Sequence, residues 1–209
     1  ILIETKPAEP TKHQYDSDVA TVYGFLARHG LEKEIRINIE QNHALLAGHT
    51  FEHEIAMAKA LGVLGSLDMN RGDDLLGWDT VQFPSNLSHV ALALYHVFRD
   101  GNLGSGGLNL DAKVRRQSID AQDLVTAHGE AIDLCARGLL VAEKMIADGE
   151  LARRIDVRYA GWKGKLGREI LSGNASLGAL AKHIEKNDIE PKPRSGQQER
   201  LESIVNGYI

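Results

Sequence analysis

Four acidic residues stand at the ends of four short apolar segments, and they are the residues of this chain best placed to do chemistry. The segments cover residues 1–4, 35–40, 64–68 and 108–111, and they end in Glu4, Glu40, Asp68 and Asp111. When parallel strands alternate with helices, the carboxyl ends of the strands share one face. Four carboxylates there would repel one another unless a cation lay among them, and Mg²⁺ or Mn²⁺ prefers oxygen ligands. The pattern therefore indicates a metal site; the alternative is four unrelated strand-end acids.

Three further side chains follow these strand ends closely. His43 comes three residues after Glu40, Lys6 comes two residues after Glu4, and Asp79 lies in the long loop 70–83. We expect His43 to reach the same cation or a neighbouring one, and Lys6 to polarise a substrate oxygen. Each residue also has an ordinary alternative, because a loop histidine often serves as a hydrogen-bonding residue and an aspartate beside glycines often forms a turn.

Helical segments separate the strand-like ones, and this alternation predicts an α/β fold with parallel strands joined by helices. From residue 118 onward the strand signal disappears, and one long amphipathic helix is predicted over 120–149. We therefore expect two regions, a metal-binding (βα)₄ region over 1–117 and a helical arm for oligomerisation over 118–209. The predicted helices of the two regions cover 16–30, 48–62, 84–101 and 120–149, followed by 166–171, 177–184 and 199–205.

Two other groups of polar residues resemble functional motifs less closely. His49 and His53 stand four residues apart with acids nearby, but the order differs from the His-Glu-x-x-His of zinc proteases. We interpret them as part of a solvated helix face. Arg115 and Arg116 could bind an anionic substrate, although the pair is more typical of a solvated loop.

Composition narrows the class of protein. The 209 residues are 43% apolar and 25% charged, with a net charge of −5, which is ordinary for a globular chain and excludes a fibrous or disordered one. The mild acidity argues against nucleic-acid or membrane partners, and no apolar run approaches the roughly 20 residues that span a bilayer. A single cysteine, Cys135, cannot form an intrachain disulfide, so we expect a cytoplasmic location.

Several longer motifs resemble xylose isomerase. They are Ile-Leu-Ile-Glu-x-Lys-Pro at 1–7, Glu-Pro-Thr-Lys-His-Gln-Tyr-Asp at 9–16, Asn-Ile-Glu-x-Asn-His-Ala at 38–44, Gly-Trp-Asp-Thr at 77–80 and Leu-Asn-x-Asp-Ala-Lys-Val-Arg-Arg at 108–116. The resemblance continues through 149–162 and covers essentially this whole chain. It implies the C-terminal half of a TIM (β/α)₈ barrel with four parallel strands, followed by a helical arm that embraces a partner subunit.

The resemblance also implies a role for each candidate residue. Glu4, Glu40, Asp68 and Asp111 would bind the metal that holds two sugar hydroxyls, and Glu40 would bridge to a second cation. That second cation, according to the same resemblance, would be held by His43 and Asp79. Lys6, Glu4 and Asp111 would contact the substrate. The implied reaction converts D-xylose, and possibly glucose, to the ketose by a 1,2-hydride shift that uses Mg²⁺, Mn²⁺ or Co²⁺.

This chain departs from the family in two ways. Val81 stands where the second-metal motif Asp-x-Asp has its second aspartate, so we expect the second cation site to be weakened. The ring-opening histidine and its aspartate belong to the family's N-terminal half, so we expect a truncated enzyme with weak or no activity alone.

Two alternatives to this interpretation are open. The chain could be a non-catalytic, metal-binding homo-oligomeric remnant, or one half of a two-chain isomerase completed by a separate N-terminal half. In each case the outer strands of the half-sheet would be exposed edges. We therefore expect a dimer or larger assembly.

Overall fold

The computed structural model describes residues 1–9 and 12–209, which form two compact units. The first unit comprises residues 1–146 together with Ile209, and the second comprises residues 147–208. Pro10 and Thr11, which belong to the motif at 9–16, lie outside the described residues.

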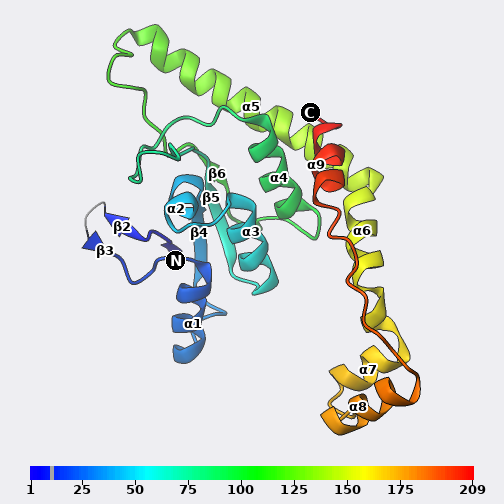
Figure 1. Cartoon of the computed structure of the whole chain (residues 1–209). Coiled ribbons are helices and arrows are strands. Elements are labelled where there is room, and N and C mark those ends of the chain that lie inside the picture. Colours follow the sequence, from blue (N-terminus) through cyan, green and yellow to red (C-terminus); the bar gives the residue numbers. More distant parts are fainter. Residues whose placement is uncertain (10–11) are drawn as a thin grey trace. The chain divides into compact units, whose positions relative to one another are not determined.

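A four-stranded parallel sheet organises the first unit (Figure 1). Its strand order is β1 (Leu2–Glu4), β4 (Arg36–Glu40), β5 (Leu64–Asp68) and β6 (Leu108–Asn109). The connections contain α1 (Val19–His29), α3 (Phe51–Ala60) and α4 (Leu87–Phe98). The prediction of four parallel strands joined by helices is therefore confirmed.

Two small elements were not anticipated from the sequence. The first is an antiparallel hairpin of β2 (Ala8–Glu9) and β3 (Lys12–His13). The second is α2 (Gln41–Leu46), which begins directly after β4, with the extended residue Glu40 as its N-cap. Because α2 starts at the strand end, it holds His43 beside the carboxyl end of the sheet.

Side-chain alternation divides β4 into an apolar and a polar face. Ile37 and Ile39 are completely buried, as are Leu26, Ile55 and Leu94 of the neighbouring helices, and each such side chain contributes about 1.5–3 kcal/mol by burial. Successive strand residues point to opposite faces. Asn38 and Glu40, the polar residues of β4, therefore share the other face.

The long helix α5 (Ala121–Asp148) follows the sheet and matches the helix predicted over 120–149. It approaches α4 closely, because a Cβ added at Gly138 would lie 2.6 Å from Val90 Cγ1. Contacts thus group most of α5 with the sheet. The boundary expected at residue 117, between metal binding and oligomerisation, stays a prediction. Among the described residues, no helix combines the length and apolar character needed to cross a bilayer.

The second unit is wholly helical and has almost no interior of its own. Gly167 is the single buried residue between 147 and 208, while Leu171 is 69% and Leu177 86% exposed. A unit of this kind buries too little apolar surface to be stable by itself. Its elements are α6 (Glu150–Tyr159), the 3₁₀ helix η1 (Ala160–Lys163), α7 (Lys165–Leu171), α8 (Leu177–Lys186) and α9 (Gln198–Asn206).

Candidate metal centre

The four strand-end acids meet in the folded chain. Glu4, Glu40 and Asp68 end strands β1, β4 and β5, and Asp111 lies two residues beyond β6. One oxygen from each of the four carboxylates lies within 4.8 Å of the other three. The parallel sheet therefore brings these residues together as the sequence pattern predicts, whereas their role as ligands stays a prediction.

Glu40 is the completely buried member of this group and has the most unfavourable environment. Its side chain is completely buried, and within the described residues neither carboxylate oxygen accepts a hydrogen bond. Burial above all raises the pKa of Glu40 to about 8; His43 and the Asn70 side chain act against this shift, and the smaller repulsion from Asp79 and Asp111 adds to it. Buried carboxylates without donors are rare and costly. A hard divalent cation would supply the missing partner, so this donor set fits such an ion.

Two asparagines, which the sequence analysis missed, orient the acids. Asn38 Nδ2 lies 2.7 Å from Asp68 Oδ2 and 3.5 Å from Glu4 Oε2, and Asn109 Nδ2 lies 2.9 Å from Asp68 Oδ1. Amide donors of this kind hold carboxylates in place for a metal. Their signal in the sequence is the two-residue spacing, since Asn38 precedes Glu40 by two positions on the same strand face.

His43 lies between the strand-end carboxylates and Asp79. The imidazole is buried, with Nε2 3.3 Å from Glu40 Oε1 and 3.2 Å from Asp79 Oδ2, and with Nδ1 3.4 Å from Glu4 Oε1. Although burial opposes it, the contacts with Asp79 and Glu40 raise the pKa of His43. Glu4 and Glu40 thus belong both to the four-carboxylate group and to the Glu4–Glu40–His43 group, whereas Asp79 belongs to neither. The role of Glu40 as a ligand shared by two cations stays a prediction.

Lys6 and Asp79 form an ion pair at the edge of this region. Lys6 Nζ lies 3.0 Å from Asp79 Oδ2 and also pairs with Glu9. Burial works against it, but these two carboxylates raise the pKa of Lys6. At Asp79, burial would raise the pKa. Hydrogen bonds from His43, Lys6 and Asn42 nevertheless hold the pKa of Asp79 well below its usual range. Both groups are therefore charged, and Lys6 would have to exchange a carboxylate partner to contact a substrate.

The backbone that follows Asp79 is strained and clamped. Val81 has a φ of +39°, in the left-handed region that β-branched residues rarely adopt. Arg115 Nη2 donates to the carbonyls of Thr80 at 2.8 Å and of Val81 at 3.1 Å, and the Lys113 N–H donates to the Val81 carbonyl at 2.8 Å. Arg115 is exposed and lies in a loop, as the solvated-loop interpretation expects, and its guanidinium also fixes the loop that carries Asp79.

Comparison with known proteins agrees with the motifs. The family model of the XylA2 C-terminal domain matches residues 155–209. The xylose isomerase of Brucella suis biovar 1 (strain 1330) is 58% identical over 209 residues, which are 100% of this chain and 48% of that protein. The xylose isomerase of Ruegeria sp. (strain TM1040) is 57% identical over 209 residues, with the same coverage of 100% and 48%.

The parallel sheet and the helices that follow it agree with the C-terminal half of a xylose isomerase TIM barrel. The chain spans about half the length of the curated relatives it matches. The resemblance to the xylose isomerases that the motifs indicate is therefore confirmed over the whole of this chain.

Proposed function

We propose that this chain supplies the metal centre of an aldose–ketose isomerase of the xylose isomerase type, with D-xylose as substrate. The observation that carries this proposal is the group of four strand-end carboxylates, one of which is the buried Glu40, whose oxygens accept no hydrogen bond within the described residues. The identity of 58% to a xylose isomerase supports the choice of reaction. A bound Mg²⁺, Mn²⁺ or Co²⁺ would stabilise the negative charge that develops on sugar oxygens while hydride moves between C1 and C2.

We expect the buried acids to bind the cation and the exposed residues to contact the substrate as well. Glu40 is completely buried and Asp68 is 6% exposed, so both would hold the cation from the interior side. Glu4 and Asp111 are exposed, and these two ligands would therefore also border the substrate. Lys6, charged and 20% exposed at its side chain, would donate a hydrogen bond to a sugar oxygen after leaving one of its carboxylates.

The proposed function requires a partner chain, because the sheet has two open edges within the described residues. β1 and β6 each pair with one neighbour there and form the two edges, and residues 147–208 lack a core. We propose a homo-oligomer, or assembly with a complementing N-terminal half, and no nucleic-acid or membrane partner. A cytoplasmic location stays a prediction that rests on the single cysteine, Cys135. The alternative function, a metal-binding assembly without turnover, is favoured if cation binding occurs without isomerisation.

An isomerisation assay tests the proposal directly. D-xylose conversion to D-xylulose would be measured with Mg²⁺, Mn²⁺ or Co²⁺, for the chain alone and for the chain mixed with the N-terminal half of the Brucella suis relative. We expect turnover only in the mixture, and none with Glu40→Gln in place of the wild type. Cation binding without turnover in either arm would instead favour the non-catalytic assembly. Sedimentation should show a dimer or larger species, and a compact monomer would contradict the assembly.

A further inference from the structure

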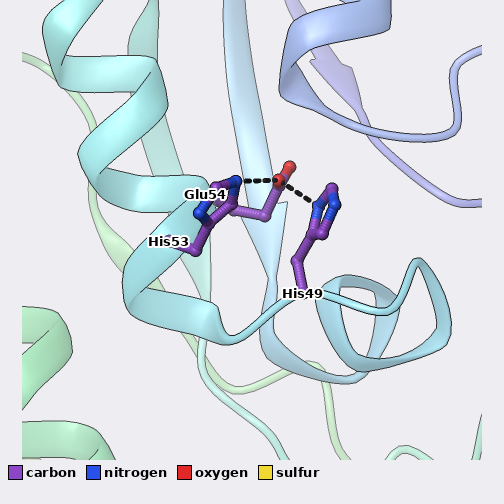
Figure 2. Close-up of side chains that lie close together, drawn as sticks. All are labelled: His49, His53 and Glu54. Carbon is purple, nitrogen blue, oxygen red and sulfur yellow. Dashed lines mark hydrogen bonds and ion pairs between the residues drawn. The ribbon is translucent and has the colours of Figure 1, made fainter.

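A second group of potential ligands lies outside the metal centre, at the beginning of α3 (Figure 2). His49 Nδ1 lies 2.7 Å from Glu54 Oε1, and His53 Nε2 lies 4.0 Å from the same oxygen. One ligand atom from each of the three side chains lies within 4.8 Å of the other two. Both imidazoles thus point at a single carboxylate oxygen.

This group combines two partly exposed imidazoles, as the expected solvated helix face predicts, with a buried carboxylate. Glu54 is only 2% exposed. Its other oxygen, Oε2, accepts a hydrogen bond of 2.8 Å from the Val19 N–H, so the carboxylate is fixed from behind. The side chains of His49 and His53 remain 32% and 50% exposed, so an ion could reach them from solvent.

We propose that His49, His53 and Glu54 form a binding site for a borderline-soft divalent transition metal, Zn²⁺ above all. Two imidazole nitrogens and one carboxylate oxygen are a typical protein donor set for Zn²⁺, with water as a fourth ligand. At metal–ligand distances of about 2.0–2.1 Å, neighbouring tetrahedral ligands are about 3.3 Å apart. The 2.7 Å and 4.0 Å separations would each change by about 0.6–0.7 Å. Small rotations of two partly exposed imidazoles can supply such changes.

Two features of α3 bear on the charge of this site. The positive end of the helix dipole disfavours a cation, but Glu52 and Glu54 both lie in the first turn and add negative charge there. The Val19 N–H holds the Glu54 carboxylate in the way that outer hydrogen bonds hold metal ligands elsewhere. A purely structural role would explain the His49–Glu54 hydrogen bond and the contact between the two imidazole rings, whose centroids are 4.7 Å apart, but it would not require both rings to direct a nitrogen at the same carboxylate oxygen.

The site is tested by titrating the whole chain with Co²⁺, a coloured substitute for Zn²⁺, in excess Mg²⁺ that occupies the carboxylate centre. Visible absorption reports nitrogen ligation, and calorimetry with Zn²⁺ gives the affinity. His53→Ala removes one imidazole. His49→Asn removes the other while keeping an N–H donor near Glu54, so it separates metal ligation from the hydrogen bond. His29→Ala is the matched control, because it removes an exposed imidazole elsewhere in the same unit.

We expect the wild type and His29→Ala to bind one nitrogen-ligated Co²⁺, and His53→Ala and His49→Asn to bind it more than tenfold more weakly, since even changes behind a metal ligand cost about 10–100-fold in affinity. His43→Gln removes the imidazole of the carboxylate centre, and it should leave this signal in place. If His53→Ala or His49→Asn loses its helical circular dichroism, Glu54→Gln replaces it, since its amide keeps an oxygen for Val19.

Unchanged affinity in His53→Ala and His49→Asn would overturn the proposal and leave a hydrogen-bonded structural group only. A wild type with no Co²⁺ signal in excess Mg²⁺ would do the same. Loss of the signal in His43→Gln alone would assign the nitrogen ligation to the carboxylate centre. None of these results depends on isomerase turnover, so failure of this site and failure of the proposed function remain distinguishable.

Discussion

Val81→Asp restores the carboxylate that the resemblance places beside Asp79, and it also relieves a strained backbone. Val81 has a φ of +39°, and a left-handed conformation costs an ordinary residue about 1–2 kcal/mol. Aspartate and asparagine tolerate this region several-fold better than β-branched residues do. The substitution therefore adds an oxygen ligand for the second cation at a position whose backbone already suits the new residue.

Val81→Asp changes both the backbone strain and the charge at this position, and each change has its own expected magnitude. Relief of strain should raise the free energy of unfolding by up to about 1 kcal/mol for both Val81→Asp and Val81→Asn. In chelator the aspartate variant should gain less, because its new charge is close in sequence to the ionised Asp79. With cation present, the added carboxylate should tighten binding at least tenfold, which corresponds to about 1.4 kcal/mol.

The measurement is a calorimetric titration with Mn²⁺, supported by urea unfolding in chelator and in Mn²⁺. Val81→Asn is the matched control, since it shares the backbone preference and the shape of aspartate but lacks the charge. We expect a second binding event of higher affinity only in Val81→Asp. Equal affinity and stoichiometry in the aspartate and asparagine variants would refute the reasoning that a lost carboxylate weakens the second site.

Three further substitutions test other parts of the structure. Glu40→Gln should stabilise the metal-free chain by about 1–3 kcal/mol at pH 7, because burial raises the pKa of Glu40 to about 8 and folding must therefore protonate it, a cost that the amide does not have. The substitution should also abolish the rise in Tm with Mg²⁺, and persistence of that rise would contradict the metal centre. Arg115→Ala should cost about 1 kcal/mol in urea unfolding and weaken the second cation, and unchanged values would show that the clamp is dispensable. Gly138→Ala should lower the free energy of unfolding by about 1–3 kcal/mol, because its new methyl group would clash with Val90. Gly129→Ala, which has open space around it in the same helix, should raise that free energy by about 0.5–1 kcal/mol. Equal Tm values for the two variants would refute the close approach of α5 to α4.

The parallel sheet and the meeting of the strand-end acids were predictable because both depend on local patterns. Short apolar segments that end in an acid, separated by helical segments, are sufficient to place Glu4, Glu40 and Asp68 on one rim of a parallel sheet. Asp111 was predicted correctly for the same reason, although β6 ends two residues earlier, at Asn109. The position of these residues required no knowledge of distant contacts.

Other features were not predictable because they depend on contacts between distant segments. Arg115 binds carbonyls more than 30 positions away, and no local pattern distinguishes it from its neighbour Arg116. The burial of Glu54 depends on Val19, which is 35 residues earlier in the chain. The left-handed backbone at Val81 goes against the preference of valine, so a reading of local propensity gives the wrong conformation there.

The candidate ligands become more exposed from β5 and β4 towards β1, and this difference affects cation binding and catalysis differently. The Glu4 side chain on edge strand β1 is 44% exposed, whereas Glu40 on β4 is completely buried and Asp68 on β5 is 6% exposed. A cation among these ligands would be enclosed from the β4 and β5 side and open to water beside β1. Water weakens the electrostatic stabilisation that a metal gives to charge on a substrate oxygen. In the proposed isomerase, the described residues would therefore provide a nearly complete ligand set but only part of a dry pocket, and the covering surface would have to come from another chain or chain segment before hydride transfer could be fast.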